Sequence, residues 1–222
     1  MRSSRAVEIV GGGLAGLSLG LALRRAGVTT RIIEAGSYPR HRVCGEFITG
    51  LPAATRTHLG LNDFLGDAAQ NREVGWFIRG CTVRHQRLPS VALGLSRHAL
   101  DTRLADAFVA AGGELQTNTR AIDLRNLTGR VFATGRRRST SAWLGLKIHA
   151  VSLELARDLE VHLGDHAYIG LTRIESNRVN ICGLFRRREI TGKGSDLLLA
   201  YLEQCDLGSL AQRLRVACPS RR

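Results

Sequence analysis

"AVEIVGGGLAGLSLGLALRRAGVTTRIIEAG", residues 6–36, is the stretch that decides the fold of this 222-residue chain. It is apolar and glycine-rich, so it has two competing interpretations: a signal peptide, or a strand, a glycine turn and a helix. A signal peptide needs a basic start, an uninterrupted apolar centre and a small-residue cleavage site. Glu8 interrupts the apolar run, and Arg24 and Arg25 stand where cleavage would occur. We therefore expect the stretch to remain in the mature chain.

The glycines of this stretch have the spacing G-x-G-x-x-G directly after an apolar run of strand length, residues 6–10. Each glycine has its own physical reason. Gly11 permits a tight turn, Gly13 lets a pyrophosphate approach the backbone, and Gly16 lets the helix pack closely on the strand. The spacing therefore predicts the phosphate-binding start of a dinucleotide fold.

The residues that follow complete this pattern. Backbone N–H groups at Leu14 and Ala15 are expected to point toward the phosphates, assisted by the helix dipole. A second strand then ends in Glu34, 18 residues after Gly16. This is close to the ~20-residue spacing of a carboxylate that binds ribose hydroxyls. The order strand, glycines, helix, strand and acid is far more specific than a glycine triplet alone.

Composition argues against two other classes, nucleic-acid-binding proteins and membrane-spanning proteins. The formal charge of +13 invites a nucleic-acid interpretation, but the basic residues are almost all arginines spread along the chain, and no nucleic-acid-binding motif accompanies them. We therefore predict no nucleic-acid partner. No run of about 18 uncharged apolar residues exists, so we predict no transmembrane segment.

Cysteine and histidine usage points to no metal site. The five cysteines are at 44, 81, 182, 205 and 218. Their number is odd, their spacing is wide and no C-x-x-C motif occurs, which favours a reducing cytoplasm over a disulfide scaffold or zinc. The histidines are scattered without the spacing of metal ligands. We predict a cytoplasmic protein without a metal.

A second motif, Arg42-Val43-Cys44-Gly45-Glu46, follows the acidic strand end. A basic residue followed by Cys-Gly-Glu resembles the flavoprotein family that contains geranylgeranyl reductases and the related group A flavin monooxygenases and halogenases. Two further stretches match in order. Residues 96–115 resemble the family's Arg-x-x-Leu-Asp-x-x-Leu helix, and residues 131–139 resemble the Ala-Thr-Gly turn that closes its FAD domain. The resemblance covers roughly residues 6 to 215.

The resemblance implies FAD as cofactor and NAD(P)H as a transient electron donor, because no second glycine triplet provides a nicotinamide domain. It also nominates the cofactor-binding residues. These are Gly11, Gly13, Leu14, Ala15, Gly16, Glu34, Arg42, Cys44, Gly45 and Arg97. Cys44 and Glu46 are candidate catalytic residues, because the motif lies near the flavin in relatives. Cys44 has an alternative as a small buried apolar residue, while the basic neighbour Arg42 favours a thiolate.

The predicted fold class is α/β, with a Rossmann-like parallel sheet that binds FAD. Its strands are expected near residues 6–10, 30–34, 114–117 and 131–133. Residues 144–185 alternate as strands joined by turns at 164–165 and 176–177, which predicts an antiparallel substrate-covering sheet. A C-terminal helical tail begins near residue 194 and is expected to pack on that sheet, since its leucines would otherwise be exposed. We predict domains at residues 1–143 and 144–222.

Two departures from the family pattern affect the functional prediction. The family's third FAD motif, a Gly-Asp after the substrate sheet, is not found; "LGDAAQ" at 65–70 resembles it in the wrong place and is interpreted as a turn. The segment 121–130 is also shorter than in relatives. We predict an FAD-dependent oxidoreductase that reduces or hydroxylates a hydrophobic small molecule, with weakly bound FAD. The alternative is a non-catalytic nucleotide-binding remnant, and the sequence does not specify an oligomeric state.

Overall fold

The computed structural model describes residues 6–121, 128–136 and 141–217 of the chain. The chain divides into two compact units. The first comprises Met1–His41, Ala53–Phe64 and Arg97–Ser139; the second comprises Arg42–Pro52, Leu65–Ser96 and Thr140–Arg222. Both units draw on several chain segments, and the two-domain division at residue 143 stays a prediction.

The first unit contains the predicted parallel sheet. Its described strands are β1 (Val7–Val10), β2 (Thr30–Ile33), β6 (Glu114–Gln116) and β7 (Arg130–Phe132), in the order β6-β2-β1-β7. Every pairing between them is parallel. The short runs rich in valine and isoleucine form strands, as predicted for a parallel sheet. The parallel part of the fold prediction is therefore confirmed.

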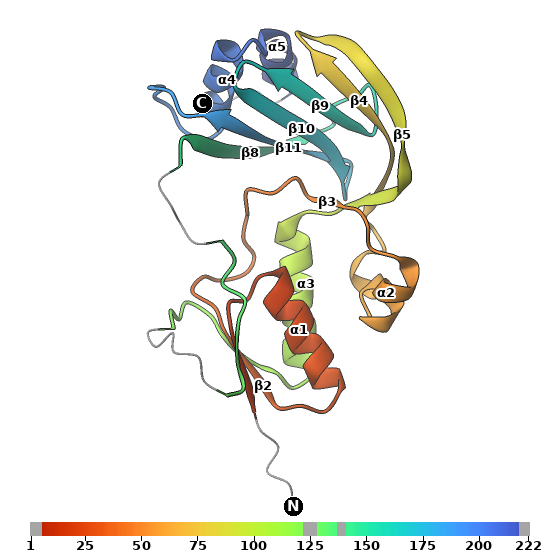
Figure 1. The fold of residues 1–222 in the computed structure, drawn as a ribbon, viewed down its shortest axis with the longest axis vertical. Coiled ribbons are helices and arrows are strands. Elements are labelled where there is room, and N and C mark those ends of the chain that lie inside the picture. The colour runs from red at the N-terminus through yellow and green to blue at the C-terminus, as the bar shows by residue number, and fades with distance from the viewer. Residues whose placement is uncertain (1–5, 122–127, 137–140, 218–222) are drawn as a thin grey trace, which may run out of the picture. The chain divides into compact units, whose positions relative to one another are not determined.

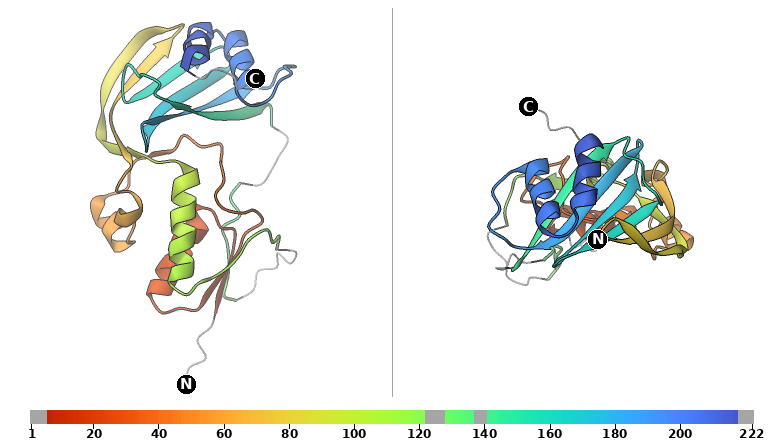
Figure 2. Two further views of the ribbon diagram at one scale, coloured as in Figure 1. Left: turned by 180° about the vertical axis from the view of Figure 1, so that it is seen from behind. Right: turned by 90° about the horizontal axis from the view of Figure 1, so that it is seen from above.

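Two helices of this unit, α1 (Leu14–Arg25) and α3 (Arg97–Ala110), lie side by side in both views (Figures 1 and 2). They approach closely because α1 carries a glycine at the contact. A Cβ added to Gly20 would lie 2.8 Å from Ile32 Cδ1 and 3.0 Å from Phe108 Cε2. Leu17 and Phe108 are fully buried. The unit also contains the short helix α2 (Ala53–His58) and the 3₁₀ turn η1 (Asn62–Phe64).

The second unit is built on a larger sheet than the sequence predicted. Its described strands are β3 (Phe47–Ile48), β4 (Ala69–Ile78), β5 (Cys81–Gly94), β8 (Trp143–Val151), β9 (Leu159–Gly164), β10 (Ala167–Ile174) and β11 (Arg178–Arg186). They are arranged in the order β3-β5-β4-β9-β10-β11-β8. The pairings among β8 to β11 are antiparallel as predicted. The sheet as a whole is mixed, however, because β4 pairs with β9 in parallel.

The predicted turns of this unit are present. Asp165 and His166 form the two-residue connection between β9 and β10, one residue later than the predicted turn at 164–165, and Glu175, Ser176 and Asn177 connect β10 to β11. His166, Ser176 and Asn177 have positive φ values, as tight hairpin turns require. The sequence "LGD" at 65–67 lies in a bend and turn immediately before β4, so its interpretation as a turn is confirmed.

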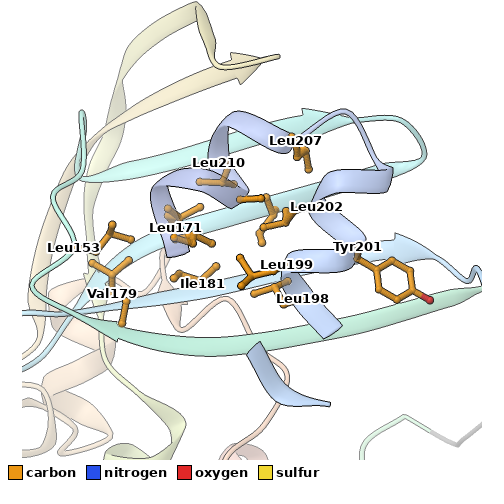
Figure 3. Packing of buried hydrophobic residues seen from close by; sticks show 14 of the residues in the cluster. Leu153, Leu171, Val179, Ile181, Leu198, Leu199, Tyr201, Leu202, Leu207 and Leu210 are labelled. Carbon is orange, nitrogen blue, oxygen red and sulfur yellow. The ribbon is translucent and has the colours of Figure 1, made fainter. Parts of the chain in front are cut away.

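The helical tail forms α4 (Gly194–Gln204) and α5 (Gly208–Ala217), and both helices cover one face of the sheet (Figures 1 and 3). This face bears the alternate residues of β10 and β11, including Leu171 and Ile181, which are fully buried. Leu198 and Leu202 of α4 and Leu210 of α5 pack against them. The expectation that the tail covers the sheet is therefore confirmed.

A buried ion cluster joins this helical layer to β9. Glu160 accepts hydrogen bonds from Arg213 Nη1 at 2.7 Å and from the Ala156 N–H at 2.6 Å, and its Oε2 lies 2.9 Å from His162 Nε2. His162 in turn stacks on Phe77, with the ring centroids 4.6 Å apart. Burial raises the pKa of Glu160, but the hydrogen bonds from His162 and Arg213 outweigh it and lower the pKa to about 2.

We expect this cluster to make the protein acid-sensitive. Because the folded-state pKa of Glu160 is depressed, its stabilisation is complete above pH 4.5 and is lost as the pH falls toward 2. The difference amounts to at most about 3 kcal/mol. Urea unfolding of the parent chain and of Glu160→Gln, compared at pH 7 and below pH 4, measures it. An equal loss of stability in both proteins on acidification would contradict the assignment to Glu160.

Within the described residues, every helix is too short or too polar to span a lipid bilayer.

Candidate functional site

The turn between β1 and α1 contains two glycines that the close packing of the fold requires and a third, Gly13, that leaves space for a ligand. Gly11 has φ of +110°, and a Cβ there would lie 2.4 Å from the Ala133 carbonyl oxygen. A Cβ on Gly16 would lie 1.9 Å from the Gly11 carbonyl oxygen. By contrast, among the described residues outside its own turn and helix, a Cβ on Gly13 would come within 4 Å of Arg97 Nη2 alone, at 4.0 Å. Gly11 and Gly16 therefore allow the fold to close, whereas Gly13 leaves open space beside the backbone.

The start of α1 suits an anion. Gly13 is the extended N-cap residue of this helix and makes no side-chain capping bond, and the first turn, which includes Leu14 and Ala15, holds no acidic residue. The first N–H groups of a helix have no partner within the helix, and the helix dipole places partial positive charge there. The structure thus gives the predicted residues the geometry of a phosphate cradle.

Glu34, at the end of β2, lies beside this turn and is already engaged. Its Oε2 accepts the Gly12 N–H at 2.7 Å, and its Oε1 accepts the Gly36 N–H at 2.8 Å and Arg40 Nη1 at 2.5 Å. Burial raises its pKa, but the bonds from Arg40 and the two backbone N–H groups outweigh this and lower it. Glu34 is therefore an ionised carboxylate that holds the glycine turn, and its contact with a ribose stays a prediction.

Sequence reasoning missed Tyr38 and Arg40, which complete this corner of the first unit. Tyr38 Oη donates to the Gly12 carbonyl oxygen, and Arg40 Nη2 donates to the same oxygen at 2.7 Å. The Arg40 guanidinium lies 4.7 Å from the centroid of the Tyr38 ring. The signal that could have found Arg40 is a basic residue six positions after an acid that ends a strand.

Arg97, at the start of α3, lies close to the glycine turn, because its Nη2 is 4.0 Å from the position of a Cβ on Gly13. It forms a two-bond ion pair with Asp101, at 2.6 Å and 2.9 Å. Asp101 has no exposed side-chain surface, so the guanidinium is fixed in orientation. The structure thus brings together Arg97 and the glycine turn from positions far apart in the sequence. Contact of Arg97 with the cofactor stays a prediction.

The Arg42, Cys44, Gly45 and Glu46 motif belongs to the second unit. Arg42 and Gly45 are exposed and Cys44 is half-buried. Cys44 is tied to the sheet, because its carbonyl oxygen accepts Asn180 Nδ2 at 3.0 Å and its Sγ accepts the Glu46 N–H at 3.4 Å.

A second thiol lies beside Cys44. Burial, and after it the nearby Cys44, raises the pKa of the Cys182 thiol on β11 to about 11. Cys182 is therefore a protonated thiol at neutral pH, which is the less nucleophilic form.

Glu46 is the most constrained residue of the motif. It has a positive φ of 52° and no exposed side-chain surface. Its carboxylate pairs with Lys147 Nζ through Oε1 and lies 2.7 Å from His149 Nε2 through Oε2. Sequence reasoning nominated Glu46 but missed both partners. Their only signal was two polar residues at alternate positions of an otherwise apolar strand.

Comparison with known proteins places this geometry in a family. Residues 4–144 match the family described as the FAD binding domain, and the chain belongs to that family. It is also similar to a menaquinone reductase of Mycolicibacterium smegmatis, at 25% identity over 138 residues. That match spans 60% of this chain and 34% of the relative, so the chain corresponds to about a third of the relative's length.

Solved structures agree in fold. The chain is similar to Klebsiella pneumoniae HpxO in complex with FAD and uric acid, with a TM-score of 0.75 and 15% identity over 98% of this chain and 66% of that one. It is also similar to 2-methyl-3-hydroxypyridine-5-carboxylic acid oxygenase, with a TM-score of 0.70 and 18% identity over 92% and 67% of the two chains. The resemblance to an FAD-dependent flavoprotein family is therefore confirmed, while the geranylgeranyl reductase branch stays a prediction.

Proposed function

We propose that this protein is an FAD-dependent oxidoreductase that acts on a hydrophobic small molecule, with NAD(P)H as a transient electron donor. The observation that carries the proposal is the open space beside Gly13, at the start of an uncapped helix and within reach of Arg97. Membership of the FAD binding domain family supports the same cofactor.

The residues of the first unit fit the ADP half of FAD. The turn at Gly13 and the N–H groups of Leu14 and Ala15 would hold the pyrophosphate, and Arg97 would add a fixed positive charge. The glutamate that ends β2, Glu34, would take the ribose hydroxyls. When bound, the flavin supplies hydride transfer or oxygen activation, while the chain binds it, orients it and excludes water.

The helix-free face of the second unit supports an apolar substrate. Side chains alternate along each strand, so the residues opposite the leucine core share this face. Cross-strand register places Val161 beside Trp76 on one side and Gly170 on the other. A Cβ on Gly170 would lie 3.8 Å from the Cys182 carbonyl oxygen, so a side chain larger than glycine could be accommodated at the middle of this face.

The test is an absorbance spectrum of the purified protein, before and after addition of FAD and desalting, followed by flavin fluorescence during titration. We expect FAD to bind and to exchange, and NAD(P)H to be oxidised when a quinone is supplied. A folded protein that binds no FAD would contradict the proposal. Binding without any NAD(P)H oxidation would favour the non-catalytic alternative.

A further inference from the structure

The glycine turn of the first unit contains a fourth glycine that its motif does not require. Gly12 stands at the first variable position of G-x-G-x-x-G, and its φ lies outside the left-handed region that favours glycine. What Gly12 lacks is room for a side chain. A Cβ there would lie 2.1 Å from Tyr38 Oη and 3.0 Å from Glu34 Cβ. Gly12 is therefore a glycine because two side chains that follow β2 occupy the space its Cβ would need.

Side chains bind both polar groups of Gly12. Glu34 Oε2 accepts the Gly12 N–H at 2.7 Å. The Gly12 carbonyl oxygen accepts two donors, Tyr38 Oη and Arg40 Nη2, the second at 2.7 Å. A carbonyl oxygen has two lone pairs, so it can accept both bonds together. The orientation of the turn at Gly12 is thus set by the segment that follows β2.

The bonds to the Gly12 carbonyl oxygen also fix the direction of the next N–H group. The peptide bond between Gly12 and Gly13 is trans and planar, so its C=O and N–H point in opposite directions. Because Tyr38 and Arg40 hold the oxygen, the Gly13 N–H points away from them. Gly13 is the N-cap residue of α1, so its N–H is among the groups that the helix itself leaves without a partner.

The charge of Arg40 is already matched by two carboxylates. Its Nη1 donates to Glu34 Oε1 at 2.5 Å, and its Nε lies 3.7 Å from Asp101 Oδ2. Asp101 also accepts the two bonds from Arg97, at 2.6 Å and 2.9 Å, and has no exposed side-chain surface. Arg97 reaches the open space at the start of α1, whereas Arg40 is bound to the turn itself. The two arginines therefore have different roles.

We propose that Tyr38 and Arg40 are positioning residues for the pyrophosphate of an adenosine diphosphate group. By binding the Gly12 carbonyl oxygen, they aim the Gly13 N–H at the pyrophosphate before the ligand binds. A donor that is already fixed in direction loses less conformational freedom on binding, so the ligand is held more tightly. This inference rests on the proposed function, in which the adenosine diphosphate group is part of FAD.

The first experiment measures the Kd of ADP and of FAD for Tyr38→Phe and Arg40→Lys. Tyr38→Phe loses the hydroxyl but keeps the ring that lies 4.7 Å from the guanidinium. Arg40→Lys keeps the positive charge but lacks the planar fork that binds Glu34 and Gly12 together. We expect each variant to raise both Kd values about tenfold or more, with a melting temperature close to that of the parent. Parent-like Kd values in both variants overturn the proposal.

Tyr201→Phe and Arg31→Lys are the matched controls. Tyr201 Oη also donates to a backbone carbonyl oxygen, that of Arg188 at 3.2 Å, but it does so in the second unit. Arg31 also pairs with a glutamate of the first unit, but its partner is Glu8 on β1. Both controls should keep the Kd of ADP within about twofold of the parent. Losses as large as those of the test variants would overturn the proposal.

The second experiment needs no ligand. Gly12→Ala places a Cβ 2.1 Å from Tyr38 Oη, so this variant should melt at a lower temperature than the parent. Adding Tyr38→Phe removes the hydroxyl and should restore most of the loss, because the two positions are in contact. The same addition should not rescue Gly16→Ala, whose Cβ meets the Gly11 carbonyl oxygen instead. Equal melting temperatures of Gly12→Ala and its double variant would overturn the proposal.

The measurements separate this inference from the proposed function. A parent chain that binds ADP but not FAD, with weaker ADP binding in both test variants, would contradict the oxidoreductase function and support the positioning role. A parent chain that binds FAD no better than both test variants do would leave the function supported and overturn the positioning role. A parent chain that binds neither ligand would contradict both.

Discussion

Gly13→Val is expected to abolish FAD binding without unfolding the protein. Gly13 is extended, with φ of −83° and ψ of −174°, and valine adopts this conformation readily. Among the described residues beyond its own turn and helix, the new Cβ would approach the end of the Arg97 side chain alone, at 4.0 Å. The branched side chain would instead fill the space that a pyrophosphate needs. Fluorescence titration with FAD should show no saturable binding, while circular dichroism and the melting temperature stay close to those of the parent.

Gly16→Ala is the matched control for this prediction. Replacing glycine by alanine inside a helix ordinarily stabilises it by up to about 1 kcal/mol. Here the added Cβ would lie 1.9 Å from the Gly11 carbonyl oxygen, so the turn or the helix must move. We expect Gly16→Ala to lower the melting temperature. If Gly13→Val binds FAD like the parent, the glycine turn is not the phosphate site and the proposed function loses its main support.

The difference between these glycines was predictable because it is local. The spacing of three glycines between a strand and a helix assigns each a steric role. The role of Gly11 also depends on Ala133, which is distant in the sequence, but Gly16 meets the Gly11 carbonyl oxygen within the turn itself. The same holds for the hairpin turn at Ser176 and Asn177 and for the amphipathic tail. Each of these features is determined by residues within about one turn or one hairpin of each other.

What the sequence did not reveal depends on contacts between distant segments. The β4–β5 hairpin escaped prediction because most of β5 is exposed and lacks a buried apolar face. The parallel pairing of β4 with β9 escaped prediction because these two strands are far apart in the chain. Lys147 and His149 meet Glu46 across sequence separations of 101 and 103 residues. Nothing in the pattern of a single strand specifies such a partner. The ion pair that Arg40 makes with Glu34 is closer in sequence, but it depends on how the loop after β2 turns back.

Leu202→Ala is expected to cause a large loss of stability in the second unit. Leu202 of α4 is fully buried and packs in the cluster that joins α4 and α5 to the sheet (Figure 3). Truncation of a fully buried leucine costs about 2–5 kcal/mol, because it loses apolar burial and leaves a cavity. For a chain of this size the melting temperature should fall by roughly 5–15 °C.

Val216→Ala on α5 controls for the loss of methyl groups, since Val216 is 83% exposed; its free energy of unfolding should remain within about 0.5 kcal/mol of the parent. The comparison is made by urea unfolding. If Leu202→Ala were as stable as Val216→Ala, the helical tail would not be part of the folded unit. The helix-free face would then have lost the rigid support that a binding surface requires. A large loss in Leu202→Ala alone would instead show that the tail stabilises the sheet on which Lys147 and His149 are carried.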